Sequence, residues 1–159
     1  MKKFVLALAV GFGLGFSPIA SGTFGALLGL PIVYFLFPHL GGIVGQIIAA
    51  ILLTLLAIPI CDVAEKHYRK KDDGRIVADE YLTFPICMIG LPYAAPAMLL
   101  TAFLTNRFFD ILKPPPARLI DTIMPGGAGI TLDDAVAALY ALGANWLLYL
   151  YLLKPMGWA

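Results

Sequence analysis

Residues 4–61 contain no aspartate, glutamate, lysine or arginine, a run far longer than any apolar segment of a soluble core. The chain of 159 residues is 60% hydrophobic and 13% charged, with a mean hydropathy of +0.88, whereas soluble domains are about 25% charged. We therefore expect an all-α, polytopic integral membrane helical bundle that forms a single domain over residues 1–159. The net charge of +1 gives no support for a nucleic-acid partner, and nothing in the sequence specifies an oligomeric state.

Two membrane spans fit within this run, at about residues 22–37 and 42–60, joined by a short turn that contains Pro38 and Gly41. A hairpin of two spans returns the chain to the side on which it began. The glycine-rich stretch before the hairpin and the charged stretch after it should therefore share one face of the membrane. Residues 4–16 are too short to cross, and we expect them to lie at the interface or inside the bundle rather than to be a cleaved signal peptide.

The charged stretch, residues 62–80, indicates how the protein is oriented. Its five basic side chains are Lys66, Arg69, Lys70, Lys71 and Arg75, whereas the turn at residues 38–42 has no lysine or arginine. By the positive-inside rule, the charged face lies in the cytoplasm. The expected location is thus the cytoplasmic (inner) membrane, with the functional site facing the cytoplasm.

Residues 81–106 are again uncharged but are interrupted by Gly90, Pro92 and Pro96. Each half has roughly ten residues, and at about 1.5 Å per residue it covers only half of a ~30 Å hydrocarbon core. Broken helices are tolerated at membrane depth where neighbouring protein satisfies the backbone. We expect a re-entrant helical hairpin here rather than a kinked through-helix, with the last span at about residues 135–153.

Two groups of carboxylates interrupt the apolar sequence: Asp72, Asp73, Asp79 and Glu80 in KDDGRIVADE (residues 71–80), and Asp133 and Asp134 after a glycine-rich turn. Ionisable groups beside a membrane segment are costly, so their usual role is functional. Hard oxygen ligands of this kind suit Mg²⁺ or Mn²⁺. The alternative is a pair of solvated loops whose charges have no function.

Two further polar patches could bind phosphate. In residues 11–25, several glycines accompany the hydroxyls of Ser17, Ser21 and Thr23 before an expected helix, whose N-terminus would suit an anion. Close packing of membrane helices is the alternative explanation for these small residues. In residues 107–113, a spacing of three would place Arg107, Asp110 and Lys113 on one helical face, where the two cations could hold a phosphate or merely extend to the interface.

Taken together, the three patches predict a metal-dependent site for a phosphorylated ligand at the edge of the membrane. A cluster of carboxylates repels a phosphate unless a divalent cation lies between them. Metal ions and basic side chains that neutralise charge in this way are typical of phosphoryl transfer.

The chain resembles the phosphatidylglycerophosphatase A family, whose hallmarks are GxGxSPxxPGTxG, KDxGxIVxDE, FRxFDxxKPxP and GGxGIMxDD. The corresponding stretches here, in the same order, are GFGLGFSPIASGTFG, KDDGRIVADE, NRFFDILKPPP and GGAGITLDD. Departures from the pattern include Ser21 (usually proline), residues 82–83 (usually Val-Gly), Thr131 (usually methionine) and Ala138 (usually glycine). Every acidic and basic hallmark residue is present.

The resemblance implies a Mg²⁺-dependent phosphatase that removes the terminal phosphate of phosphatidylglycerophosphate, a phospholipid of the bilayer, to give phosphatidylglycerol. Mn²⁺ is an alternative metal. On this basis we expect the catalytic residues to be Asp79, Glu80 and Asp134. The expected metal ligands are Asp72, Asp79, Glu80, Asp133 and Asp134. The expected phosphate- and substrate-binding residues are Ser17, Gly22, Thr23, Arg107, Asp110 and Lys113.

Three questions remain open at this point. The attacking group could be metal-activated water or an aspartate. A small ion or solute transporter or channel is an alternative function, because broken helices and buried acids also form ion pathways. A purely structural membrane subunit is the third possibility, and it predicts that no single carboxylate matters.

Overall fold

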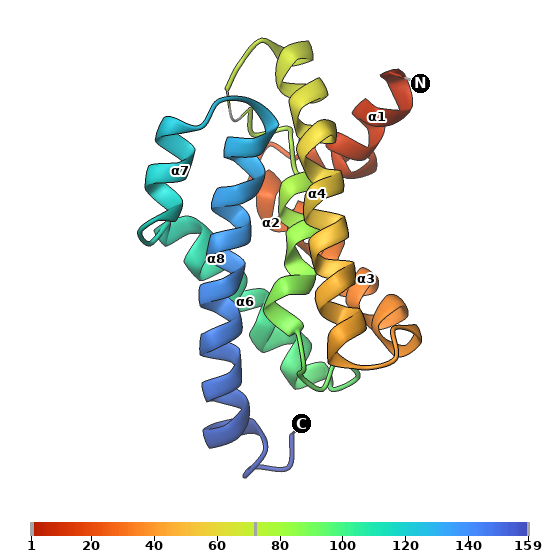
Figure 1. Ribbon diagram of the computed structural model, residues 1–159, viewed down its shortest axis with the longest axis vertical. Coiled ribbons are helices and arrows are strands. Elements are labelled where there is room, and N and C mark those ends of the chain that lie inside the picture. The colour runs from red at the N-terminus through yellow and green to blue at the C-terminus, as the bar shows by residue number, and fades with distance from the viewer. Residues whose placement is uncertain (1, 72, 159) are drawn as a thin grey trace.

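The computed structural model describes residues 2–71 and 73–158, and this part of the chain contains helices and no strands (Figure 1). In chain order, the elements are α1 (Lys2–Ala9), η1 (Gly11–Phe16), α2 (Ser21–Leu27), α3 (Gly29–Leu36), η2 (Phe37–His39), α4 (Ile43–Tyr68), α5 (Ala78–Thr83), η3 (Phe84–Met88), α6 (Pro96–Leu112), α7 (Ala117–Ile123), α8 (Gly126–Leu148) and η4 (Tyr149–Leu153).

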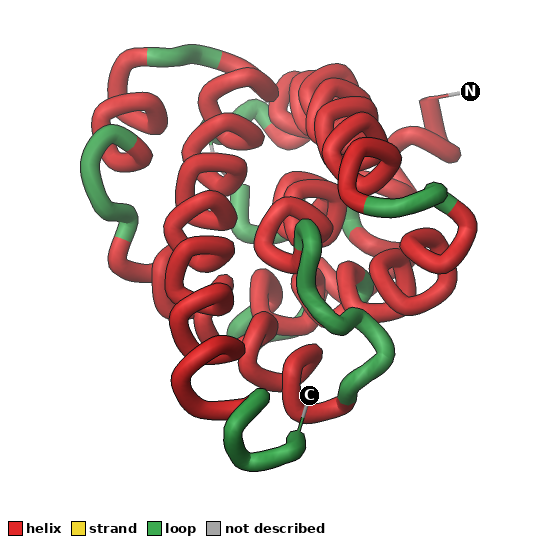
Figure 2. The backbone as a smooth tube through the Cα atoms, turned by 60° about the horizontal axis from the view of Figure 1, so that its bottom comes forward, coloured by secondary structure: helices red, strands yellow, loops and turns green. Residues whose placement is uncertain are grey.

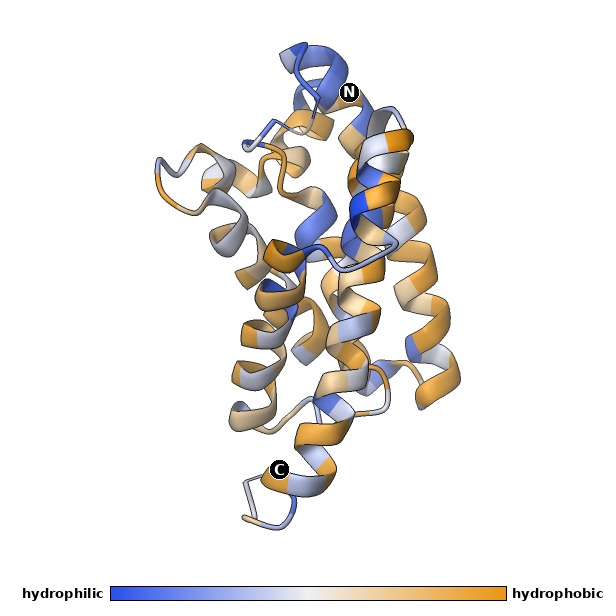
Figure 3. Ribbon diagram, turned by 90° about the vertical axis from the view of Figure 1, so that its left-hand side faces the viewer, coloured by the Kyte–Doolittle hydropathy of each residue, from blue (hydrophilic) through white to orange (hydrophobic). Residues whose placement is uncertain are grey.

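In the part of the chain that the structure describes, three helical segments are long and apolar enough to cross a membrane: Ser21–His39, Ile43–Tyr68 and Gly126–Leu153. The first two form the predicted hairpin. Large apolar side chains cover much of the outer surface, and in Figure 3 the hydrophobic colour dominates the long helices. Such a surface is unfavourable in water and is suited to lipid. The predicted class, an all-α membrane bundle, is confirmed.

The spans alternate in direction (Figure 1). α2 and α3 run away from the end of the bundle at which α4 ends with its charged residues, α4 returns to that end, and α8 runs away again. The N-terminus therefore lies near this charged end, and the C-terminus lies at the opposite end, where Lys154 caps η4. α1 packs beside α4 at the charged end.

Between α4 and α8, the chain makes the broken hairpin that the sequence predicts. α5 and η3 run inward, residues 89–95 turn, and α6 runs back (Figure 2). Gly90 has a φ of +75°, and Pro96 begins α6, where its missing N–H costs nothing. The two ends of the uncharged segment, residues 81–106, lie close together, as the distance of 2.5 Å between Arg107 Nη1 and Glu80 Oε2 shows.

Polar side chains from the neighbouring helices satisfy the backbone at this break. Asn145 Nδ2 donates to the carbonyl of Cys87 at 2.9 Å, and Trp146 Nε1 donates to that of Ile89 at 3.2 Å. On the other side, Gln46 Oε1 accepts from the N–H of Gly90 at 2.8 Å. A break in a helix is costly in lipid unless such partners exist.

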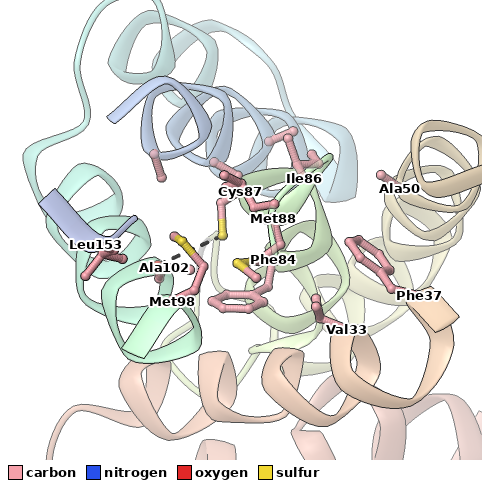
Figure 4. Packing of buried hydrophobic residues seen from close by; sticks show 14 residues of the cluster. Val33, Phe37, Ala50, Phe84, Ile86, Cys87, Met88, Met98, Ala102 and Leu153 are labelled. Atoms are coloured by element: carbon pink, nitrogen blue, oxygen red, sulfur yellow. Dashed lines mark hydrogen bonds between the residues drawn. The ribbon is translucent and has the colours of Figure 1, made fainter. Parts of the chain in front are cut away.

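The inner half of the hairpin also forms the centre of the core. Phe84 and Met88 are fully buried, together with Met98 of α6 and Val33 of α3 (Figure 4). A Cβ on Gly29 would overlap the ring of Phe84, so this glycine permits close packing of α3 against η3. The core therefore fixes the position of the short helix α5 that precedes η3.

Two expectations about helix ends were wrong. α8 begins at Gly126, whereas the sequence predicted a turn there and a span from residue 135. The glycines of this helical start allow contact with α4, because a Cβ on Gly127 would overlap the carbonyl of Ile58. α6 ends at Leu112, so Lys113 does not continue the helical face of Arg107; it has a φ of +44° and caps the helix.

Candidate active site

A cavity of about 220 Å³ lies where α2, the loop before α5, α5, α6 and α8 meet. Its lining combines carboxylates, one ammonium and a few apolar side chains. The lining residues are Ser21, Gly74, Ile76, Asp79, Glu80, Asp110, Ile111, Lys113, Ile130, Asp133 and Asp134. The two acidic groups of the sequence are thus brought together in one site.

Five carboxyl groups reach this cavity from three helices. Asp79 and Glu80 lie in the first turn of α5, Asp110 lies near the end of α6, and Asp133 and Asp134 lie two turns into α8. The residues Asp79, Asp133 and Asp134 are only 5%, 3% and 8% exposed. Carboxylates so deeply buried are costly unless cations accompany them.

Arg107 supplies one of these cations. Its Nη1 lies 2.5 Å from Glu80 Oε2 and 2.7 Å from Asp110 Oδ2, and its side chain is 14% exposed. Its Nε is buried and has no hydrogen-bond partner among the described residues. Arg107 therefore joins α5 to α6 through two carboxylates of the cavity wall.

Lys113 supplies the second cation. Its Nζ lies 2.6 Å from Asp133 Oδ2 and 3.4 Å from Asp121 Oδ2. Asp121, on α7, was not a candidate from the sequence. It also lies 3.8 Å from the ammonium of Lys71, which donates to the backbone carbonyl of Asp121 as well.

The N-terminal patch reaches the cavity through α2. A Cβ on Gly22 would overlap Glu80 Oε1, so the missing side chain is what lets this carboxylate lie against α2. Ser21 lines the cavity, and its hydroxyl donates to the carbonyl of Gly74 at 2.5 Å. Ser17 lies elsewhere, in a shallow groove with Phe16 and Phe24, and donates to the carbonyl of Ile19.

Thr23 and Asp72 are the two remaining candidate residues. Thr23 is half-buried on α2, one residue beyond Gly22. Asp72 lies outside the described residues, so its predicted role as a metal ligand stays a prediction.

Asp73 has a structural role in the loop before α5. It accepts hydrogen bonds from Arg75 Nε at 2.7 Å and Nη2 at 3.0 Å, and these bonds hold the pKa of the Asp73 carboxyl below its usual range. The Arg75 guanidinium in turn lies 3.8 Å from the centre of the Tyr68 ring. This arrangement fixes the loop that carries Gly74 and Ile76 to the cavity wall.

The donor chemistry of the cavity fits a divalent metal ion. Its carboxylate oxygens are hard ligands, and the five carboxyl groups outnumber the two cations Arg107 and Lys113. Among residues 2–71 and 73–158, however, no group of three or more carboxylate, histidine or cysteine side chains is close enough to hold an ion. A metal would therefore require shifts of carboxylates that now contact the basic side chains.

The cavity lies below the charged end of the bundle. A Cβ on Gly126 would lie 2.9 Å from Asp62 Oδ1, so α8 begins beside the first charged residue of α4, and Asp133 lies seven residues further along α8, or about 10 Å. Figure 3 shows hydrophilic segments in the middle of the ribbon, between apolar helices. One wall of the cavity is Ile111, which is 74% exposed on the apolar outer surface.

The fold and the cavity define a helical membrane protein with a carboxylate-rich cavity that borders its apolar outer surface. Comparison with known proteins identifies the family: the family model described as phosphatidylglycerophosphatase A matches residues 7–149. The chain belongs to the phosphatidylglycerophosphatase A family, a family of phosphoric monoester hydrolases.

Among the curated relatives that are similar over most of their length, two are named phosphatidylglycerophosphatase A. The protein from Haemophilus influenzae is 39% identical over 85% of this chain and 82% of its own length. The protein from Escherichia coli is 35% identical over 87% of this chain and 83% of its own length. No solved structure matches the chain significantly.

Proposed function

We propose that this protein hydrolyses phosphatidylglycerophosphate to phosphatidylglycerol and inorganic phosphate, with Mg²⁺ as cofactor and Mn²⁺ as a possible substitute. The observation that carries the proposal is the cavity itself, in which carboxylates and Lys113 lie beside Ile111 of the apolar outer surface, while Arg107 is paired with two of those carboxylates, Glu80 and Asp110. We infer the headgroup of the substrate, glycerophosphate, from the name that the two relatives share. A lipid phosphate can reach this cavity while its acyl chains remain in the bilayer.

The two basic side chains bind the phosphate in this proposal. Arg107 is anchored by Glu80 and Asp110 and supplies positive charge beside these two cavity carboxylates, while Lys113 reaches the cavity from the end of α6. Positive groups fixed in this way stabilise the negative charge of the phosphoryl group as the bond to the glycerol oxygen breaks.

The cavity carboxylates have two roles. The residues that would hold Mg²⁺ are Asp79, Glu80, Asp133 and Asp134, with Asp72 as a further ligand. When bound, Mg²⁺ supplies positive charge that offsets the phosphate and promotes attack by water. One of the carboxylates Asp79, Glu80 and Asp134 accepts the proton of the attacking water and then donates it to the glycerol oxygen as the bond from that oxygen to phosphorus breaks. Direct attack by an aspartate is the alternative, which trapping of a phosphorylated protein would reveal.

The orientation follows from the basic residues. At the charged end of the bundle, Lys66 lies in the last turn of α4, Arg69 caps this helix, and Lys70 and Lys71 follow directly, whereas Lys154 caps η4 at the other end. The positive-inside rule then directs the charged end, and with it the cavity, to the cytoplasmic side of the cytoplasmic membrane.

The test is phosphate release by the purified protein in liposomes that contain phosphatidylglycerophosphate. We expect release with Mg²⁺, none with EDTA, and recovery when Mg²⁺ is added back. Failure of the folded protein to release phosphate under any of these conditions would refute the proposed function. Full activity in EDTA would refute the metal requirement alone, and ion leakage without phosphate release would support the transporter alternative.

A further inference from the structure

The ammonium of Lys113 lies between two carboxylates on different helices. It is 2.6 Å from Asp133 Oδ2 on α8 and 3.4 Å from Asp121 Oδ2 on α7. Asp133 is 3% exposed and lines the cavity, whereas the side chain of Asp121 is 28% exposed and lies outside it. Lys113 thus connects an inner carboxylate to an outer one.

The backbone fixes where this ammonium can go. Lys113 adopts φ +44° and ψ +66° at the end of α6, and its N–H donates to the carbonyl of Phe109 at 2.9 Å. The main chain is therefore held, while the four-carbon side chain can rotate between its two partners. Asp121 is itself held by Lys71, which contacts both its side chain and its backbone carbonyl.

The inner contact competes with a metal ion. A divalent cation takes carboxylate oxygens at ~2.1 Å, and Asp133 Oδ2 now accepts a short hydrogen bond from an ammonium. Two cations cannot both lie against this oxygen without strong repulsion. An ammonium that leaves Asp133 for a site with no anion would also be costly, since the surroundings are partly buried.

We propose that Asp121 is a positioning residue that binds the ammonium of Lys113 when a divalent cation in the cavity displaces this ammonium from Asp133. In the metal-free protein, Lys113 is the internal counter-ion of Asp133. Metal binding transfers the ammonium towards Asp121, from where it points at the mouth of the cavity and meets the incoming phosphate. The inference rests on the proposed function, specifically on its metal requirement.

The test measures Mn²⁺ binding by electron paramagnetic resonance on the purified full-length protein, without substrate. Lys113→Met removes the competing ammonium, so Mn²⁺ should bind about tenfold more tightly. Asp121→Asn removes the outer partner and keeps Lys113 on Asp133, so Mn²⁺ should bind about tenfold more weakly. Asp121→Glu, which retains the charge, should restore binding to within about threefold of the wild type.

A double variant separates this mechanism from a general effect of charge. In the Lys113→Met background, Asp121→Asn should have no further effect, because its action passes through Lys113. The matched control is Asp62→Asn, which removes an equally charged group of similar exposure that is paired with Lys66, outside the cavity. Its binding should remain within about twofold of wild type.

The outcomes are distinguishable. Equal weakening by Asp121→Asn in both backgrounds would show a field or folding effect and overturn the inference, as would unchanged binding in Lys113→Met. Either result would leave phosphate release by the wild type, and so the proposed function, intact. A wild type that releases phosphate but binds no Mn²⁺ would overturn the inference together with the metal requirement.

Discussion

The carboxylate of Glu80 lies 2.5 Å from the guanidinium of Arg107, although the two residues are 27 positions apart in the chain. This contact requires the apolar segment between them to enter the bundle and return. A single straight crossing would separate the two residues by the thickness of the hydrocarbon core, ~30 Å. The ion pair thus links the topology of the protein to the composition of its cavity.

The first prediction concerns this topology. Single cysteines at the exposed positions Lys70, Arg118 and Lys154, in a background with Cys61 and Cys87 replaced by alanine, can be labelled with a membrane-impermeant thiol reagent. Positions 70 and 118 should react from the same side and position 154 from the other. Labelling of positions 70 and 118 from opposite sides would contradict a shared site.

The second prediction concerns the buried carboxylates. Asp79→Asn and Asp134→Asn retain the shape of each side chain but remove its charge, so turnover should fall by about 100-fold or more with little loss of thermal stability. Glu65→Gln, near the end of α4 and outside the cavity, is the control and should remain near wild-type activity. Similar losses at residues 65 and 79 would indicate that the assay reports folding rather than chemistry.

Much of this arrangement could be predicted because local sequence carries it. The uncharged run determines the first hairpin, and Gly90, Pro92 and Pro96 mark the return of the next segment, since glycine and proline act on their own backbone. The acidic pairs stand out because charge is rare in such a chain. The family was likewise identified from short motifs, and the comparison confirms it.

Other features depend on contacts between distant residues and could not be predicted. Asp121 is a single acid in a polar segment, and only the packing of α7 beside Lys113 gives it a role. Asn145 and Gln46 occur within apolar spans, and their partners are backbone groups of another segment. The glycines at residues 126–129 were expected to form a turn because composition does not distinguish a flexible backbone from close helix packing.

The third prediction tests the contact between α2 and the cavity. Gly22→Ala introduces a methyl group where Glu80 Oε1 now lies, so it should displace the carboxylate from Arg107 and lower turnover by about tenfold or more. Gly143→Ala is the matched control, because its added Cβ would meet no atom of the described chain within 4 Å. Equal activity of the two variants would show that the position of Glu80 is unimportant.

The fourth prediction concerns the stability of the re-entrant hairpin. Thr105 Oγ1 donates to Asn145 Oδ1 at 2.7 Å, and Asn145 in turn supports the carbonyl of Cys87. Asn145→Leu and Thr105→Val should each lower the free energy of unfolding by about 1–3 kcal/mol, because a buried polar group loses its partner. Thr101→Val removes only a bond within its own helix, to Ala97, and should have a smaller effect on thermal unfolding in detergent. Equal losses at Thr101 and Thr105 would contradict a supporting role for Asn145.

The last prediction concerns the route by which the lipid reaches the cavity. Ile111 is 74% exposed and lines the cavity, whereas Leu104, two helical turns earlier on the same face of α6, is 57% exposed and lies away from it. If acyl chains lie against Ile111 while the phosphate is bound, Ile111→Gln should remove about 1 kcal/mol of apolar contact and raise the KM for a long-chain substrate about fivefold. A short-chain, water-soluble substrate makes fewer apolar contacts with residue 111, so Ile111→Gln should hydrolyse it almost as fast as the wild type does.

Leu104→Gln introduces the same polar group on the same surface and is the control. It should alter the KM for neither the long-chain nor the short-chain substrate by more than about twofold, since residue 104 does not contact the bound lipid. Equal effects of the two variants on the long-chain substrate would mean that polarity on α6 disturbs the membrane in general, and that the phosphate enters the cavity by another route.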